Sequence, residues 1–376
     1  MNRDAPERGA KQARCTKCIM PASAPGSDFD EAGVCSWCRS GFPNYAPLGM
    51  DKLRELLDQT RGTSAVADCL VGVSGGKDSC YAALELTQTF GLRVEGFTYD
   101  YTGLARFAME NARKACGLLG IRHHVVSLPR DIHLRSFRAY FEAWVESKSP
   151  VAASISCAAC KHMHLLGSQL ARDRGIPIVV WAICPLEVPP FVTTRSEGAA
   201  QDETKGPLGL GILLAKNMLA SGKFRSAFVR FPGTSILGSL AFHPTCSFLR
   251  LRYPSVTHVQ FFDYCPWDPK KIRSRLSSAL GWSVPERVKQ DWHSDCLIHV
   301  FKEYMFLKMF NVSYLDAFLS NQIRAGLIPR DEAVDKLLTS KQYYARELGE
   351  VVSALGLERF RAQIDASCFD ERPTER

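Results

Sequence analysis

The chain alternates short, continuous apolar runs with longer stretches in which apolar residues recur every three or four positions. Continuous apolar runs are typical of strands buried on both faces, and a recurrence of three to four positions is typical of helices. The run Asp68-Cys-Leu-Val-Gly-Val73 is the first strand pattern. The pattern predicts strands at 68–73, 92–99, 121–128 and 176–183, and helices near 51–60, 80–90, 104–119, 132–144 and 161–174.

Strands that alternate with helices indicate the α/β fold class with a doubly wound parallel sheet. In such sheets, ligands bind outside the carboxyl ends of the strands. We therefore expect Tyr99, Asp100 and the segment 182–185 to flank a ligand together with the turn after residue 73, although Asp100 also suits an ordinary turn. From residue 302 onward the apolar spacing is helical, and 331–355 predicts amphipathic helices that pack on a core or at a homodimer contact.

The composition is that of a soluble globular protein. Of 376 residues, 46% are hydrophobic and 23% charged, which gives room for more than one domain. The uncharged run 231–249 contains proline, glycine and histidine, so it does not predict a membrane span. Residues 1–14 hold no apolar segment, and we expect a cytoplasmic protein without a secretory signal. The net charge of +8 suits an anionic partner, but it is equally consistent with a merely basic surface.

Cysteine is abundant, with 14 residues, and in a reducing compartment this favours metal binding or catalysis over disulfides. Two Cys-x-x-Cys pairs, Cys15/Cys18 and Cys35/Cys38, are separated by a segment rich in turn residues. This spacing predicts a four-cysteine zinc ribbon whose folding energy comes from the metal. Four cysteines also hold iron–sulfur clusters, which is the second interpretation, and four unliganded thiols are the third.

A glycine-rich turn, Ser74-Gly-Gly-Lys-Asp-Ser79, joins the first strand to the next helix. Gly75 and Gly76 let main-chain N–H groups face an anion, and the helix N-terminus adds partial positive charge. The hydroxyls of Ser74 and Ser79 and the cation of Lys77 add further donors. The turn matches neither the Walker A loop nor the dinucleotide-binding fingerprint, so we expect a phosphate site of another kind.

These six residues resemble the PP-loop of the ATP pyrophosphatases, a superfamily that includes NAD and GMP synthetases and tRNA-thiolating enzymes. The resemblance implies that ATP activates a substrate oxygen as an adenylate and that pyrophosphate leaves from the loop. It implies Mg²⁺ as a cofactor, with Asp78 holding the ion or ordering the loop and Lys77 as a second catalytic candidate. The nucleotide-binding residues it implies are Ser74, Gly75, Gly76, Lys77, Asp78 and Ser79, joined by Tyr99, Asp100 and Ala182 at the strand ends.

A narrower resemblance, to the N-acetyl sugar amidotransferases of surface-polysaccharide biosynthesis, rests on four segments besides the loop: 15–21, 29–36, 292–296 and 323–333. It implies conversion of an acetamido group on a sugar nucleotide to an acetamidino group, with ammonia from a partner glutaminase. The chain departs from that family at Ala182 and Cys184, where we expect a glycine, and throughout 186–265. The resemblance therefore carries over to the nucleotide-binding site and does not carry over to the acceptor.

Sulfur transfer to a nucleobase, a tRNA or a small carbonyl compound is the main alternative. Cys157 and Cys160 precede a predicted helix and Lys161, a setting that lowers a thiol pKa and suits a persulfide carrier fed by a sulfur donor. Cys184 stands at a strand end where ligands gather. A second metal clip or a packing pair would explain Cys157 and Cys160 equally well. A non-catalytic nucleotide-binding zinc-ribbon protein is the third candidate.

The organisation we expect has four parts: a zinc ribbon at 1–45, a PP-loop domain at 46–200, a substrate or insert region at 201–285, and a helical region at 286–376. The stretch 186–207, with Thr193, Thr194, Arg195 and Ser196, suits a substrate loop or a plain surface excursion. The histidines lack ligand spacing, so we expect structural roles for them.

Overall fold

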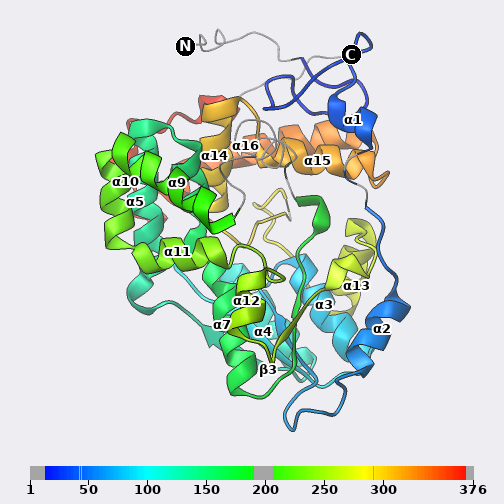
Figure 1. Cartoon of the computed structure of the whole chain (residues 1–376). Helices are drawn as coiled ribbons and strands as arrows, with labels where there is room; N and C mark the ends of the chain where they lie inside the picture. Colours follow the sequence, from blue (N-terminus) through cyan, green and yellow to red (C-terminus); the bar gives the residue numbers. More distant parts are fainter. Residues whose placement is uncertain are drawn as a thin grey trace.

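A computed structural model describes residues 13–41, 43, 45–187, 189, 206–290 and 292–369. Its centre is a five-stranded parallel sheet with the strand order β3-β2-β1-β4-β5 (Figure 1). The strands are β1 (Cys69–Gly72), β2 (Val94–Tyr99), β3 (Arg122–Val126), β4 (Ile178–Trp181) and β5 (Thr257–Gln260). The expected α/β fold with a doubly wound parallel sheet is confirmed.

The three central strands are largely apolar on both faces because helices cover both sides of the sheet, with the buried Glu95 and Thr98 of β2 as polar exceptions. Neighbouring residues of β1 belong to different cores: Val71 packs with α3 and its neighbours, and Leu70 packs in a second cluster with Trp181. β2 and β4 are buried throughout, whereas β3 at the edge alternates between exposed and half-buried positions. Burial on both faces explains why the central strands have no polar alternation in the sequence.

The helices of the first half follow the predicted spacing. α3 begins at Lys77 instead of Cys80, so the glycine-rich turn leads directly into its first residue. The helices are α2 (Met50–Asp58), α3 (Lys77–Gln88), α4 (Arg106–Leu118), α5 (Ile132–Ser147), α6 (Pro150–Ile155) and α7 (His162–Asp173).

The segment after residue 205 adds helices at the side of the sheet and one strand that the sequence did not predict. β5 is only four residues long, and two of its side chains are exposed or half-buried, so it lacks the continuous apolar signal of the inner strands. Thr193, Thr194, Arg195 and Ser196, with most of the stretch 186–207, lie outside the described residues. The helices are α9 (Gly206–Ala220), α10 (Gly222–Arg230), α11 (Pro232–Leu240), α12 (Ser247–Arg252) and α13 (Pro269–Leu280).

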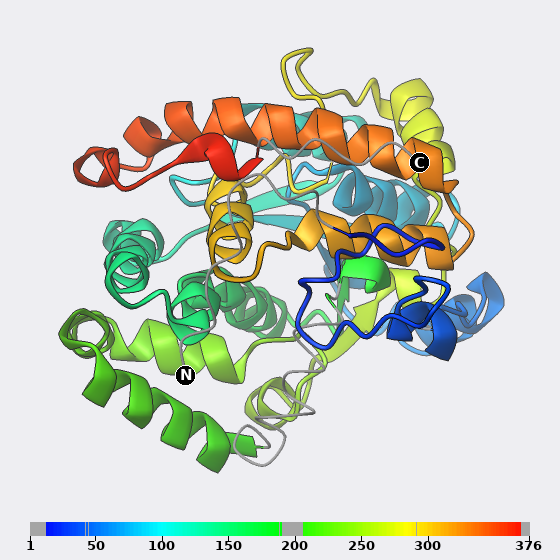
Figure 2. The ribbon, with the colours of Figure 1, turned by 90° about the horizontal axis from the view of Figure 1, so that it is seen from above.

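The C-terminal region is helical, as expected. It consists of α14 (His299–Phe310), α15 (Tyr314–Arg324) and the single long helix α16 (Arg330–Ala354). The N-terminal ribbon, with α1 (Ser36–Ser40), lies over α15 in both views (Figures 1 and 2). Among the described residues, no helix combines the length and apolarity needed to cross a bilayer.

Candidate active site

The glycine-rich turn directly follows β1, which has β2 on one side and β4 on the other. The order in which successive strands are added to the sheet therefore reverses at β1. This switch point is where doubly wound sheets bind ligands. The turn is closed by its own hydroxyls: the Ser74 N–H donates to Ser79 Oγ at 3.1 Å, and the two serine hydroxyls lie 3.2 Å apart. The Gly76 N–H donates to Ser74 Oγ at 3.3 Å. The loop is therefore ordered around the N-terminus of α3.

Only glycine fits at position 75. Its backbone has φ +85°, and a Cβ there would lie 1.8 Å from the carbonyl oxygen of Ala108. Conformation and close packing both exclude a side chain. The loop therefore packs against the start of α4, and this contact fixes the position of the loop relative to the sheet.

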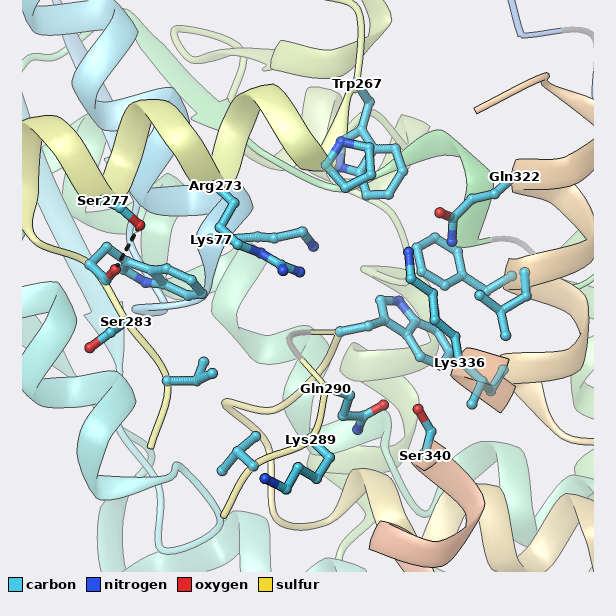
Figure 3. Close-up of a pocket in the computed structure, with 18 of the residues that line it drawn as sticks. Lys77, Trp267, Arg273, Ser277, Ser283, Lys289, Gln290, Gln322, Lys336 and Ser340 are labelled. Atoms are coloured by element: carbon cyan, nitrogen blue, oxygen red, sulfur yellow. Dashed lines mark hydrogen bonds between the residues drawn. The ribbon is translucent and has the colours of Figure 1, made fainter. Parts of the chain in front are cut away.

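Lys77 and Asp78 are both largely buried and contact each other, with 3.2 Å between Lys77 Nζ and Asp78 Oδ2. Asp78 Oδ1 accepts a hydrogen bond from Trp267 Nε1 at 3.0 Å. Burial raises the pKa of Asp78, and the charge of Lys77 opposes that rise. Both carboxylate oxygens hold the loop to neighbouring groups, and the Lys77 side chain points toward a cavity that Trp267 also lines (Figure 3).

Two further carboxylates approach the loop, and the sequence analysis gave neither of them a role. A Cβ placed on Gly76 would lie 3.4 Å from Asp295 Oδ2, so this carboxylate stands beside the turn. Glu187 accepts a hydrogen bond from Trp292 Nε1 at 3.0 Å and lies 3.5 Å from His293 Nε2. Burial alone would raise the pKa of Glu187, but His293, Lys77 and the Trp292 bond together lower it.

Tyr99 is the last residue of β2, and Asp100 and Ala182 directly follow β2 and β4, so all three lie with the loop at the carboxyl ends of the strands. Tyr99 is buried, and its hydroxyl donates to the carbonyl oxygen of Ala159 at 3.3 Å. Asp100 is exposed, and Ala182 is half-buried. The structure therefore brings the loop and these three residues to one edge.

As expected, Cys160 lies just before a helix: the 3-10 turn Ala158–Lys161 leads directly into α7, whose N-cap is Lys161. The expected lowering of the Cys160 pKa is wrong. Burial raises the pKa of its thiol although Lys161 opposes the rise. Burial likewise raises the pKa of Cys184 well above its usual value.

Cys296 is a further thiol whose pKa is raised. The pKa of Cys296 is raised to above its ordinary range by burial and, next in order, by the charge of Cys160; Cys157 adds a smaller effect. Cys296 also forms a hydrogen bond with Tyr101. The signal was available in the sequence, since Cys296 lies in one of the segments that resemble the amidotransferases.

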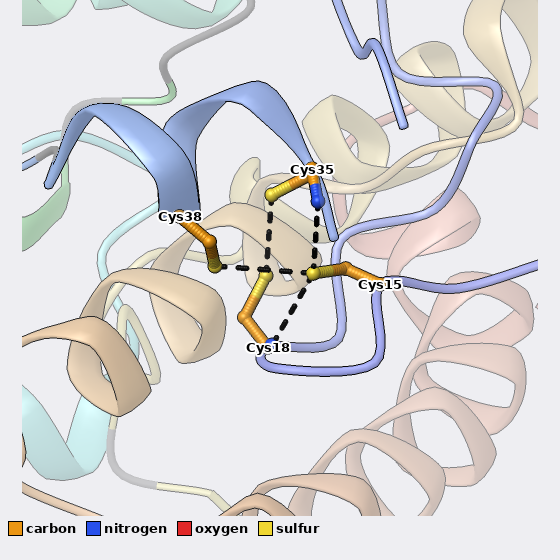
Figure 4. Close-up of side chains that lie close together, drawn as sticks. All are labelled: Cys15, Cys18, Cys35 and Cys38. Atoms are coloured by element: carbon orange, nitrogen blue, oxygen red, sulfur yellow. Dashed lines mark hydrogen bonds between the residues drawn. The ribbon is translucent and has the colours of Figure 1, made fainter. Parts of the chain in front are cut away.

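The four N-terminal cysteines converge as the spacing predicted (Figure 4). Their sulfur atoms all lie within 4.8 Å of one another, with 3.8 Å between Cys15 and Cys38 and 3.7 Å between Cys18 and Cys35. Four sulfurs at about 2.3 Å from one tetrahedral zinc ion are separated by about 3.8 Å. The donor set therefore fits a single metal ion.

The ribbon is held on the C-terminal helices by arginines. Arg324 of α15 donates to Cys18 Sγ at 3.2 Å, and Arg330 donates to the Cys18 carbonyl oxygen at 3.0 Å. Arg14 pairs with the buried Asp316 of α15 at 2.7 Å. Because α15 also lines the cavity beside Lys77, the metal site and the cavity share one helix.

No protein-family model matches the chain. The tRNA-specific 2-thiouridylase MnmA of Sulfurimonas denitrificans is 31% identical over 104 residues, which is 27% of this chain and 29% of that protein. The chain thus matches less than a third of this curated relative.

Solved structures give long but distant alignments. A U34-tRNA thiolase, NcsA of Methanococcus maripaludis with its [4Fe-4S] cluster, aligns over 95% of this chain and 90% of its own, with 14% identity and a TM-score of 0.35. An NAD+ synthetase of Burkholderia pseudomallei aligns over 92% and 94%, with 12% identity and a TM-score of 0.36. Similarities this low carry no argument about substrate.

The thiouridylase, the thiolase and the synthetase are all PP-loop ATP pyrophosphatases. The match to the thiouridylase bears out the resemblance of residues 74–79 to that superfamily, and the solved structures carry no argument for it. The narrower resemblance to sugar amidotransferases is supported by none of these three proteins.

Proposed function

We propose that this chain is an enzyme that uses Mg-ATP to adenylate an acceptor oxygen, releases pyrophosphate, and replaces the oxygen with nitrogen. The observation that carries the proposal is the closed turn at residues 74–79, which lies at the sheet switch point with two carboxylates beside it. Backbone N–H groups, serine hydroxyls and the start of α3 are suited to hold the departing pyrophosphate. Tyr99, Asp100 and Ala182 would border the nucleoside.

In this proposal the carboxylates have different roles. Asp78 orders the loop, because Trp267 and Lys77 already occupy its oxygens. Asp295 offers a carboxylate oxygen, the ligand type that Mg²⁺ prefers, and would hold the ion against the phosphates. Both oxygens of Glu187 are engaged, by Trp292 and His293, so Glu187 would position neighbouring groups as Asp78 does. When bound, Mg²⁺ would neutralise charge on the leaving pyrophosphate. Lys77 supplies a fixed positive charge at the same place.

Nitrogen is the transferred atom that we favour. A sulfur carrier needs a thiolate, and burial raises the pKa of both Cys160 and Cys184, which keeps these thiols protonated. Ammonia from a glutaminase partner needs no protein thiol. On the resemblance of 15–21, 29–36 and the C-terminal segments, we propose an N-acetyl sugar nucleotide as the acceptor and retain the four-part division of the chain.

In this proposal the N-terminal site holds zinc. Sulfurs that share one ion lie close together, whereas a cluster separates the thiolates bound to different irons. Elemental analysis should return one zinc per chain; iron with labile sulfide would contradict the assignment.

Sulfur transfer is the second candidate, and one observation favours it: Cys157 and Cys160 lie in one tight turn, in which the Cys160 N–H donates to the Cys157 carbonyl oxygen at 3.1 Å. Single replacements of these cysteines and of Cys184 by serine separate the two chemistries. A nitrogen-transferring enzyme should keep its activity in each folded variant. Lost activity in folded variants, together with a product that gains sulfur, would favour thiolation, and tRNA retained at physiological salt would identify its substrate.

The primary test incubates the full chain with Mg-ATP, ammonium and a panel of N-acetyl sugar nucleotides, followed by ion-exchange separation of the nucleotides. We expect AMP and pyrophosphate in equal amounts. ADP as the nucleotide product would contradict the proposal. Tight ATP binding without turnover on any acceptor would favour a non-catalytic nucleotide-binding protein.

A further inference from the structure

A cavity of about 570 Å³ opens beside the loop. Its walls come from α13, the segment 282–292, α15 and α16, and Lys77 connects it to the glycine-rich turn. Cavities that bind small molecules measure about 300–1,000 Å³, so this one has the size for a nucleotide-like compound.

The cavity is positively charged. Its described lining contains the cations Lys77, Arg273, Lys289 and Lys336, and Glu286 is the acid among them. Lys77 and Arg273 extend from one side and Lys336 from the other, toward a common space (Figure 3). Cations from opposite walls suit a ligand that carries phosphate.

Three tryptophans, Trp267, Trp282 and Trp292, line the same cavity. Each indole N–H is bonded to the loop or to the 3-10 turn Pro185–Glu187 that follows β4. Trp267 donates to Asp78 at 3.0 Å, Trp282 to the Gly75 carbonyl oxygen at 2.9 Å, and Trp292 to Glu187 at 3.0 Å. The rings thus wall the cavity while their polar atoms hold the nucleotide-binding elements in place. Aromatic walls of this kind suit the faces of sugar or base rings.

Neutral polar side chains complete the lining. Gln322 and Ser340 are nearly fully buried, and Gln290 lies beside Ser340, while Gln322 lies across the cavity from them (Figure 3). Amide and hydroxyl groups in such a place can orient the hydroxyl or amide substituents of a ring.

We propose that this cavity is the acceptor site and that the acceptor is a phosphorylated ring compound of the sugar-nucleotide class. The inference rests on the proposed function, to which it adds the location of the acceptor and the residues that select it. Lys289 and Lys336, which line the cavity outside the turn, bind acidic groups of the acceptor, and the tryptophans bind its rings. Because the tryptophan N–H groups hold Asp78, Gly75 and Glu187, an occupied cavity also fixes the loop on which ATP is cleaved.

The test measures binding by calorimetry without turnover. The probes are UDP-, GDP- and CMP-linked N-acetyl sugars, free N-acetylglucosamine, and α,β-methylene-ATP with Mg²⁺. The test variant is Lys289→Gln/Lys336→Gln. Its matched control is Lys270→Gln: Lys270 and Lys336 bind the same carboxylate, Glu332, at 3.1 and 2.8 Å, but Lys270 does not line the cavity.

We expect at least one sugar nucleotide to bind, with affinity about tenfold or more weaker in the double variant and within about twofold of wild type in Lys270→Gln. Free N-acetylglucosamine should bind far more weakly, and the ATP analogue should bind all three proteins equally. An ATP analogue that loses affinity in the double variant would place the ATP phosphates in the cavity and overturn the inference. So would equal loss in Lys270→Gln, or a panel in which no sugar nucleotide binds.

These outcomes are separate from the fate of the proposed function. Sugar nucleotides that bind in the cavity of an enzyme that forms ADP would preserve the acceptor site and contradict the adenylation chemistry. AMP and pyrophosphate formed with an acceptor whose affinity does not depend on Lys289 and Lys336 would support the adenylation chemistry and contradict the acceptor site.

Discussion

The glycine-rich turn and the tryptophan-lined cavity are neighbours in space, yet they are assembled in different ways. The turn is built from six consecutive residues, 74–79, whose hydroxyls close on their own backbone. The cavity takes its walls from segments between 267 and 340, and only Lys77 comes from the turn. If the proposed roles are right, phosphate binding is encoded locally, whereas acceptor selection depends on how distant helices are held together.

The four-cysteine ribbon has a local sequence motif, but like the cavity it depends on contacts with distant helices. Arg14, Arg324 and Arg330 connect it to α15 and α16, which line the cavity. Damage to the turn should therefore abolish nucleotide chemistry, and damage to the ribbon should impair acceptor binding first.

The largest effect is expected from Gly75→Ala. The new Cβ would collide with the Ala108 carbonyl oxygen, and the residue would also keep an unfavourable positive φ. A shift of the loop by about 1 Å is enough to lower turnover by about 100-fold or more. Gly91→Ala is the control, because Gly91 has φ +64° but an open surrounding, so it shares the strain without the collision. If the two variants turned over ATP equally, close packing of the loop would be irrelevant.

Cys18→Ser should release the metal and loosen the ribbon from α15. Zinc contributes about 10 kcal/mol or more of folding free energy in small zinc-binding peptides, so the ribbon is not expected to stay folded without it. We expect sugar-nucleotide affinity to fall at least tenfold, while binding of the ATP analogue changes little. Cys246→Ser is the control, since that thiol only donates to the Leu240 carbonyl oxygen and serine keeps the donor. Metal content and the affinities for the sugar nucleotide and the ATP analogue would be measured. An equal loss of both affinities would contradict the separate roles of the ribbon and the turn.

Trp267→Phe tests the connection between the two regions. It keeps an aromatic wall but removes the hydrogen bond to the buried carboxylate of Asp78, at a cost of about 1.5–3 kcal/mol. Hydrogen exchange of the amides at 74–79 should accelerate and ATP-analogue affinity should fall about tenfold. In Trp144→Phe, a matched change at a buried indole without a hydrogen-bond partner, the loop should be unaffected. Unchanged exchange in Trp267→Phe would show that the loop is ordered without the cavity wall.

Glu303→Gln is expected to affect stability and its pH dependence, with little effect on activity. Glu303 is fully buried 3.1 Å from His299 Nε2; burial raises its pKa to about 8 and lowers that of His299. Above pH 4.5 the unfolded chain releases the Glu303 proton, whereas the folded state keeps it up to about pH 8. This carboxyl therefore lowers the free energy of unfolding as pH rises from 4.5 to about 8. The slope is at most about 1.4 kcal/mol per pH unit. Buried His299, whose pKa is lowered, has the opposite effect on stability near pH 6.5 in all the proteins compared, so the decline is measured as a difference between them. In thermal unfolding between pH 5 and 9, wild type and Glu55→Gln should lose stability relative to Glu303→Gln as pH rises toward 8.

The same contrast explains what could be predicted from the sequence. The inner strands, the turn at 74–79 and the convergence of the four cysteines all depend on contiguous patterns, and each was predicted. β5 was missed because an edge strand lacks a continuous apolar run, and the raised pKa of Cys160 was missed because burial is a property of the packed fold. Asp295, Glu187 and the three tryptophans acquire their roles only through contacts with residues far away in the chain.

The most direct test of the account is the identity of the nucleotide product. The full chain would be given Mg-[α-³²P]ATP, ammonium and the sugar nucleotide that binds most tightly, and the labelled product would be resolved by ion exchange. The account predicts labelled AMP, with one pyrophosphate released for each AMP, and no such product from Gly75→Ala. Labelled ADP with release of phosphate would contradict it.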